Sequence, residues 1–126
     1  MDGNEHPTVA FFLGKLACLL HRQGRLAEAE AATREALAMN TKLVGSENLY
    51  TIVLRSQLAG VLQSQGKLAE AATLYREALA LNKKTMGNEH TFTIFLRSQL
   101  VGVLQSQGKW AEAKTLRREA QALKKR

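Results

Sequence analysis

Apolar residues recur every three or four positions through six segments of the chain, which is the spacing of one face of an α-helix. In the middle of the chain this pattern predicts one helix over about residues 50–65 and a second over about residues 68–84. Gly66 lies between them, where a helix commonly ends in a left-handed residue. The same pattern occurs before and after this pair, so the sequence predicts an all-α chain of six helices.

The three pairs of segments are copies of one another, because Gly24, Gly66 and Gly108 lie 42 residues apart in equivalent places. Residues 46–84 and 88–126 are identical at 27 of 39 aligned positions. Such a period is typical of stacked repeats, none of which buries its apolar face alone. The repeats span about residues 3–44, 45–86 and 87–126, and together they form one domain over residues 1–126.

Each repeat consists of a first helix, called helix A, and a second, called helix B. Short turns between helices of this length require antiparallel packing. The predicted fold is therefore an all-α solenoid of three stacked helix-turn-helix repeats, a short right-handed superhelix with one concave face. Alanines such as Ala71 and Ala78 allow helix B to approach its neighbour closely. The last helix is polar enough to act as a cap, whereas the first helix is apolar and less well capped.

The composition of the chain limits the classes of protein to which it can belong. The chain is 45% apolar and 23% charged, which is typical of a folded protein, and no apolar run approaches the roughly 20 residues that span a bilayer. No signal peptide is visible at its start. The lone Cys18 excludes an internal disulfide and agrees with a reducing compartment, so we expect a cytoplasmic location.

The formal net charge of +7 is concentrated at one end, since residues 109–126 carry seven Lys or Arg against two Asp or Glu. A basic helix end is favourable beside the C-terminal end of a helix dipole and needs no ligand to explain it. No aromatic residue or motif supports base recognition, so nucleic-acid binding is not expected.

A second pattern resembles a known family. The tetratricopeptide repeat has a characteristic order of residues, which this chain matches with Leu58-Ala59, Leu62, Gly66, Ala71, Tyr75 and Ala78. The 42-residue length resembles the repeats of kinesin light chains and related scaffold proteins. Those repeats open with Gly-x-x-His-Pro and a Val-Ala-x-x-Leu-x-x-Leu-Ala segment, matched here by Gly3, His6-Pro7, Val9-Ala10, Leu13 and Leu16-Ala17. Only Tyr75 keeps the aromatic residue of helix B, because Thr33 and Arg117 replace it in the other repeats.

The resemblance implies a protein-interaction module that holds an extended peptide in a concave groove lined by the A helices. The groove positions that it implies are Phe11, Gly14, Lys15, Cys18, His21 and Arg22 in the first repeat. The second repeat supplies Val53, Ser56, Gln57, Gly60, Gln63 and Ser64. The third supplies Phe95, Ser98, Gln99, Gly102, Gln105 and Ser106.

Two residue types at these positions suggest how a peptide binds. Glutamine amides both donate and accept, so they can pair with peptide backbone, while Lys15, His21 and Arg22 can meet an acidic group. Gly60 and Gly102 each cost about 1 kcal/mol in a helix and suggest room for a ligand near the backbone. Inheritance from a recent duplication, or tight packing of neighbouring A helices, explains these glycines equally well. A merely polar, solvated surface is the alternative for the other groups.

Other chemistry is not expected. The family's Lys/Asn clamp for a C-terminal carboxylate is not reproduced, which argues against chaperone-tail binding. Cys18 and His21 are three residues apart, but two ligands do not close a metal site and no acidic partner completes a catalytic one. His6 and His90 occupy equivalent turns, where the family's histidine has a structural role. We therefore expect no enzyme activity, no cofactor and no metal.

The alternative function is self-association through an uncapped end. The first helix carries Phe12 as the candidate contact residue, so the chain can form a homo-oligomer by this helix. The near identity of the repeats also fits an excised or designed repeat protein without an evolved ligand. Partner identity and pathway are not encoded in these patterns.

Overall fold

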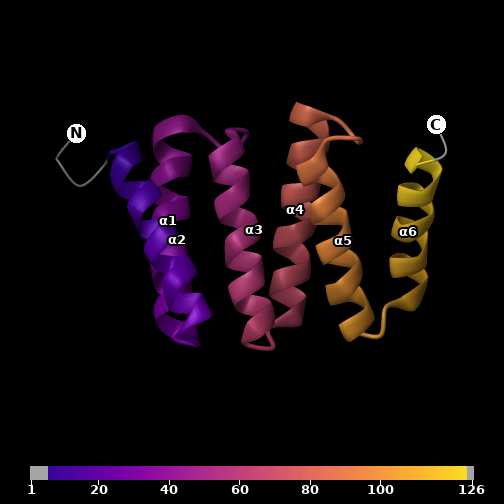
Figure 1. The fold of residues 1–126 in the computed structure, drawn as a ribbon, viewed down its shortest axis with the longest axis horizontal. Helices are drawn as coiled ribbons and strands as arrows, with labels where there is room; N and C mark the ends of the chain where they lie inside the picture. Colours follow the sequence, from indigo (N-terminus) through magenta and orange to yellow (C-terminus); the bar gives the residue numbers. More distant parts are fainter. Residues whose placement is uncertain (1–5, 125–126) are drawn as a thin grey trace.

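A computed structural model describes residues 6–124, which form six helices and no strand. The A helices are α1 (Pro7–Arg22), α3 (Leu49–Ser64) and α5 (Thr91–Ser106). The B helices are α2 (Leu26–Val44), α4 (Leu68–Met86) and α6 (Trp110–Lys124). The three hairpins stand side by side from α1 at one end to α6 at the other (Figure 1). This arrangement confirms the predicted solenoid of three stacked repeats.

The helix boundaries agree closely with the pattern of the sequence. Helix α3 begins one residue before the predicted start, and α4 continues two residues beyond the predicted end. Gly66 follows α3 with a φ of +81°, the left-handed conformation predicted for it. His6 and His90 both precede an A helix, and the Nδ1 atom of each accepts a hydrogen bond from a backbone N–H of that helix. The structural role expected of these histidines is therefore confirmed as helix capping.

The core lies between successive hairpins. Ile52, Leu58 and Leu62 of α3 pack with Tyr75 of α4 and with Leu96 of α5 in one continuous apolar cluster. Ala71 and Ala78 are completely buried in the same cluster, which confirms that small residues let α4 lie close to its neighbours. Residues from two repeats build each part of the core, so each repeat buries its apolar face only with its neighbour.

Neighbouring repeats meet through two kinds of contact. Helix B of one repeat packs on helix A of the next, and α1 also touches α3 directly. Long charged side chains join the B helices across the outer surface, where Arg34 pairs with Glu70 and Arg76 pairs with Glu112. None of the described helices has the length and apolar character that a membrane-spanning segment requires.

Candidate functional site

The predicted groove positions lie at the surface along the A helices, and we call this surface the groove face. Of the eighteen positions, seventeen are exposed or half-buried. The exception is Gly14, which is buried under α3. A Cβ on Gly14 would lie 2.9 Å from Cδ2 of Leu54 and would overlap the Tyr50 hydroxyl. Gly14 therefore serves the packing of α1 against α3, and its assignment to the groove is wrong.

Three of the predicted groove side chains, Gln57, His21 and Ser64, already bond between α1 and α3. The Nε2 atom of Gln57 donates a hydrogen bond of 2.9 Å to the carbonyl oxygen of Gly14. The Nε2 atom of His21 and the Ser64 hydroxyl share a hydrogen bond of 2.8 Å. Both bonds connect α1 with α3, so these side chains fix the spacing of the first two A helices.

An aromatic cluster lies at the other end of this helix pair. The rings of Phe11 and Tyr50 are 5.7 Å apart, and the Tyr50 hydroxyl donates a 3.4 Å hydrogen bond to the carbonyl oxygen of Phe11. The ammonium group of Lys15 lies 5.3 Å from the centre of the Phe11 ring, within the range of a cation–π interaction. Tyr50 was not among the predicted groove residues, although an aromatic side chain at the second residue of α3 was a signal for it.

The third repeat leaves its groove face open. Phe95 is 42% exposed and stacks on Phe92 with 5.9 Å between ring centres. Within residues 6–124 the side chains of Ser98, Gln99 and Gln105 make no hydrogen bond. These amide and hydroxyl groups are therefore free to bind an external group, unlike that of Gln57.

The two mid-helix glycines have different surroundings. A Cβ on Gly60 would lie 3.6 Å from the Tyr75 hydroxyl oxygen and 3.9 Å from Cε1 of His21, both ordinary contact distances. A Cβ on Gly102 would have no neighbour within 4 Å. Tight packing of adjacent A helices therefore does not explain either glycine, and the space beside Gly102 is open.

The charged residues of the A helices are all basic. Helices α1, α3 and α5 contain no Asp or Glu, whereas each B helix contains at least two. Lys15 and Arg22 are exposed at the first repeat and give the groove face a positive charge. The acidic residues of the B helices pair largely with basic residues on the outer surface, as Glu30 and Glu70 do with Arg34.

A cavity of about 380 Å³ opens between α5 and α6, and Ser98 is the one predicted groove position among its lining residues. Its apolar wall includes Ile94, Val101 and Leu116. Arg97 also lines it, is only 2% exposed, and has no hydrogen-bond partner for its Nε or Nη1 atom within the described part of the chain. The signal in the sequence was the arginine at a position where the first repeat has Leu13.

Residues 6–124 contain no group of three or more His, Cys, Asp or Glu side chains placed to hold a metal ion. Cys18 is half-buried, and His21 is engaged with Ser64 rather than with the thiol. The pKa of the Tyr75 phenol is raised by burial, and the side chain is only 3% exposed. This environment keeps the Tyr75 hydroxyl neutral.

Comparison with known proteins agrees with the fold. A sequence profile described as "Tetratricopeptide repeat" matches residues 44–126, and a second of the same description matches residues 13–49. No curated protein matches the chain.

Two solved structures are similar to this one. The first is a crystal structure of nearly identical TPR-like repeats from Podosopora anserina, from a protein described as a kinesin light chain, with a TM-score of 0.80 and 27% identity. The match covers 89% of this chain and 53% of that chain. The second is a variant of that protein with one glutamine replaced by methionine, with a TM-score of 0.82 and 25% identity. That match covers 94% of this chain and 56% of the other. This chain thus spans about half the length of those structures.

Proposed function

The chain belongs to the tetratricopeptide repeat family, and we propose that it binds a short, extended, acidic peptide on the groove face. Repeats of this family mediate protein–protein interaction. The single observation that carries the proposal is the charge division between the helices. The A helices have no acidic residue, while their exposed face carries Lys15, Arg22 and unpaired amides.

The peptide binds by two kinds of contact. Carboxylates of the peptide meet Lys15 and Arg22, both of which are exposed on α1. The amides of Gln99 and Gln105 pair with the peptide backbone, since each can donate and accept. An extended chain presents such backbone groups along its whole length, and the free groups of α5 form the receiving row.

Apolar side chains of the peptide have two places to pack. Phe11 and Phe95 are equivalent residues of the first and third repeats, and both rings are more than two-fifths exposed. The open space beside Gly102 lets the peptide backbone approach α5 closely. These features support a peptide with apolar residues on either side of an acidic stretch.

Fluorescence anisotropy with labelled Asp- and Glu-containing peptides tests the proposal. Gln99→Trp fills the groove face and is expected to weaken binding by about tenfold or more. Thr73→Trp places the same bulk on an exposed position of α4 and is expected to leave affinity unchanged. Lys15→Glu should also weaken binding and should reduce its dependence on salt. Equal affinity for all four proteins would refute a site on the groove face.

Self-association is a second proposed function, and one observation favours it. Phe12 of α1 is 65% exposed, which makes it more exposed than any other large apolar residue of the described chain. Leu16 and Leu19 of the same helix are also exposed, and a contiguous apolar patch marks an interaction site. Phe12→Glu should abolish any concentration dependence of the mass in solution, whereas a protein that is monomeric at every concentration would exclude this function.

A further inference from the structure

One face of α1 is exposed although the equivalent faces of α3 and α5 are buried. Phe12, Leu16 and Leu19 are 65%, 48% and 53% exposed. The residues 42 and 84 positions later, none more than 2% exposed, are Leu54, Leu58, Val61, Leu96, Leu100 and Val103. In α3 and α5 this face packs on the preceding repeat. The face of α1 is therefore a repeat interface without its partner surface.

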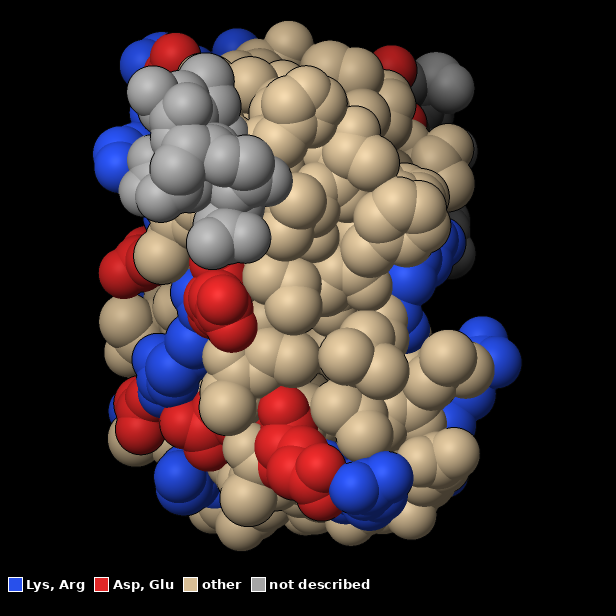
Figure 2. Space-filling view, turned by 90° about the vertical axis from the view of Figure 1, so that its left-hand side faces the viewer, with Lys and Arg blue, Asp and Glu red and all other residues tan. Residues whose placement is uncertain are grey.

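Figure 2 views the molecule from this end of the stack. Uncharged residues fill the middle of this view, whereas acidic and basic side chains lie along its left side, across its lower part and at its right edge. Exposed Phe12, Leu16 and Leu19 make this end of the stack apolar as well, and the core of a protein–protein interface is typically apolar and depleted of charge.

The opposite end of the stack has the matching receptor surface. Val61 of α3 packs in a cluster with four residues of the first repeat, Ala17, Leu20, Ala29 and Ala32. The residues 84 positions after these four are Val101, Leu104, Ala113 and Leu116. Val101 and Leu116 line the open cavity between α5 and α6, which no further helix covers within residues 6–124. Leu19 is the equivalent of Val61 in the first repeat. The cavity wall is the equivalent of the surface on which Val61 packs.

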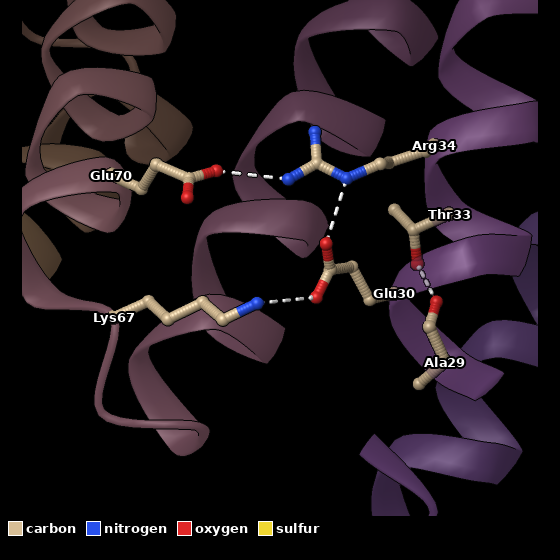
Figure 3. Close-up of polar contacts among 6 residues, drawn as sticks. All are labelled: Ala29, Glu30, Thr33, Arg34, Lys67 and Glu70. Carbon is tan, nitrogen blue, oxygen red and sulfur yellow. Dashed lines mark hydrogen bonds and ion pairs between the residues drawn. The ribbon is translucent and has the colours of Figure 1, made fainter. Parts of the chain in front are cut away.

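Ion pairs on the outer surface repeat with the same register. Arg34 Nη2 lies 2.9 Å from Glu70 Oε2, and Arg76 Nη2 lies 2.8 Å from Glu112 Oε1. Figure 3 shows the first of these pairs between the B helices. Continuing the register by 42 residues leaves Arg118 at the last repeat, where it has no ion pair in the described chain. Extending it in the other direction leaves Glu28 at the first repeat, bonded only within its own turn to Arg25.

From the exposed face of α1, the cavity wall between α5 and α6 and the ion-pair register, we infer that copies of this chain dock end to end. Helix α1 of one copy lies against α5 and α6 of the next. The inference rests on the second proposed function and names its partner as a second copy. Leu19 of one copy packs on Val101 and Leu116 of the other. Arg118 then pairs with Glu28 across the junction, as Arg76 does with Glu112 inside the chain. The junction reproduces the internal repeat interface.

One contact at this junction is unfavourable. At the first internal junction Glu30 bonds Lys67 with 3.2 Å between Oε1 and Nζ. The equivalents at the junction between copies are Lys114 and Arg25, which carry like charges. Both are exposed, so the repulsion is partly screened by salt. The copies also repel through their formal net charge of +7. End-to-end docking should therefore strengthen as salt rises, up to the point where screening is complete.

The contact joins two different surfaces, so the assembly does not close on itself at two copies. A head-to-tail interface leaves one free end of each kind and adds further copies. A symmetric dimer through α1 alone would instead stop at two. The mass distribution in solution distinguishes these two forms of self-association.

A mixing experiment with two blocked variants tests the inference. Phe12→Glu blocks the α1 end, and Ala120→Glu blocks the cavity end at a position whose equivalent, Ala78, is buried. At about 150–500 mM salt, charges on the surface are largely screened. Under these conditions light scattering should find each variant monomeric and an equimolar mixture forming a one-to-one dimer, with circular dichroism as the check on folding. Each block should weaken docking about tenfold or more.

Other outcomes have definite meanings. If Ala120→Glu alone dimerises, α1 pairs with α1, and end-to-end docking is wrong while self-association stands. If the wild-type chain stays at its monomer mass of 13.9 kDa at all concentrations, both are wrong. Peptide binding on the groove face is measured on monomeric Phe12→Glu and is unaffected by either result.

Charge variants provide a second test that leaves the apolar surfaces intact. Arg118→Glu should weaken docking about threefold to tenfold, and combining it with Glu28→Arg should restore the loss. Lys114→Glu should strengthen docking by a similar factor, because it recreates the Glu30–Lys67 pair against Arg25. Glu35→Arg, an exposed change outside the register, is the control for net charge. Lys114→Glu and Glu35→Arg change the net charge by equal amounts in opposite directions. If the gain in docking affinity from Lys114→Glu is no larger than the loss from Glu35→Arg, net charge alone explains both effects and the register is wrong.

Discussion

The Nδ2 atom of Asn82 donates a 2.7 Å hydrogen bond to Oγ1 of Thr93, joining the end of one repeat to the start of the next. The Thr93 hydroxyl in turn donates a 2.8 Å hydrogen bond to the carbonyl oxygen of Gly87 in the turn between them. Asn40 and Thr51 form the same bond, 2.8 Å long, one repeat earlier. Asn82 and Thr93 are completely buried, so this relay fixes how successive hairpins meet.

Breaking the relay should destabilise the stack. Asn82→Ala removes the donor to Thr93 and leaves a small cavity, so the free energy of unfolding should fall by about 1–3 kcal/mol. Urea denaturation followed by circular dichroism measures the change. Asn88→Ala, at an exposed position of the same turn, is the control and should change stability by less than about 0.5 kcal/mol. Equal effects of the two substitutions would show that the relay contributes nothing.

Two glycine-to-alanine substitutions should have opposite signs. Gly102→Ala meets open space and gains helix propensity, so it should raise the free energy of unfolding by about 0.5–1 kcal/mol. Gly14→Ala places its methyl group against the Tyr50 hydroxyl and buried Leu54, and it should lower stability by about 1–3 kcal/mol. Thermal unfolding of both variants gives the comparison. A stabilising Gly14→Ala would contradict the close approach of α1 and α3.

The pair between Glu30 and Arg34 should make stability sensitive to acid. The hydrogen bond from Arg34 is the largest cause that holds the pKa of Glu30 below its ordinary value of 4.5; burial opposes this lowering, and the hydrogen bond from Lys67 adds to it. A lowered folded-state pKa adds stability above pH 4.5 that is lost as pH falls through the lower value. Glu30→Gln should therefore be less stable than wild type at pH 7, with the difference shrinking below pH 4.5.

Urea unfolding at pH 7 and near pH 3 provides this comparison, with Glu35→Gln as the matched control. Glu35 is exposed on the same helix and makes no ion pair within residues 6–124. A constant difference between wild type and Glu30→Gln across this range would be the contradicting result.

Burial of Tyr75 should have an effect at alkaline pH. Burial raises the pKa of the Tyr75 phenol above its ordinary 10.0, so the unfolded chain releases its proton first. Stability is then lost as pH rises through 10. Tyr75→Phe should match wild type within about 1 kcal/mol at pH 7, because the hydroxyl makes no hydrogen bond in the described chain. Above pH 10 the variant should lose less stability than wild type, and parallel losses would contradict this assignment.

The sequence by itself was enough to predict the six helices and the glycine that ends α3. The apolar spacing around Leu58 and Leu62 and the glycine at residue 66 act within one or two helical turns. His90 likewise caps α5 through a residue only two positions away. Such local interactions depend on nearest neighbours in the chain, so their geometry can be derived from residue order alone.

Only the tertiary structure decided which groove groups are free. Gln57 and Gln99 are equivalent in sequence, yet Gln57 bonds Gly14 across the first pair of A helices and Gln99 makes no bond within residues 6–124. The burial of Arg97 and the pairing of Arg34 with Glu70 were likewise not predictable. These contacts join residues about one repeat apart or depend on the end of the stack, and small differences in helix packing determine whether two such side chains meet.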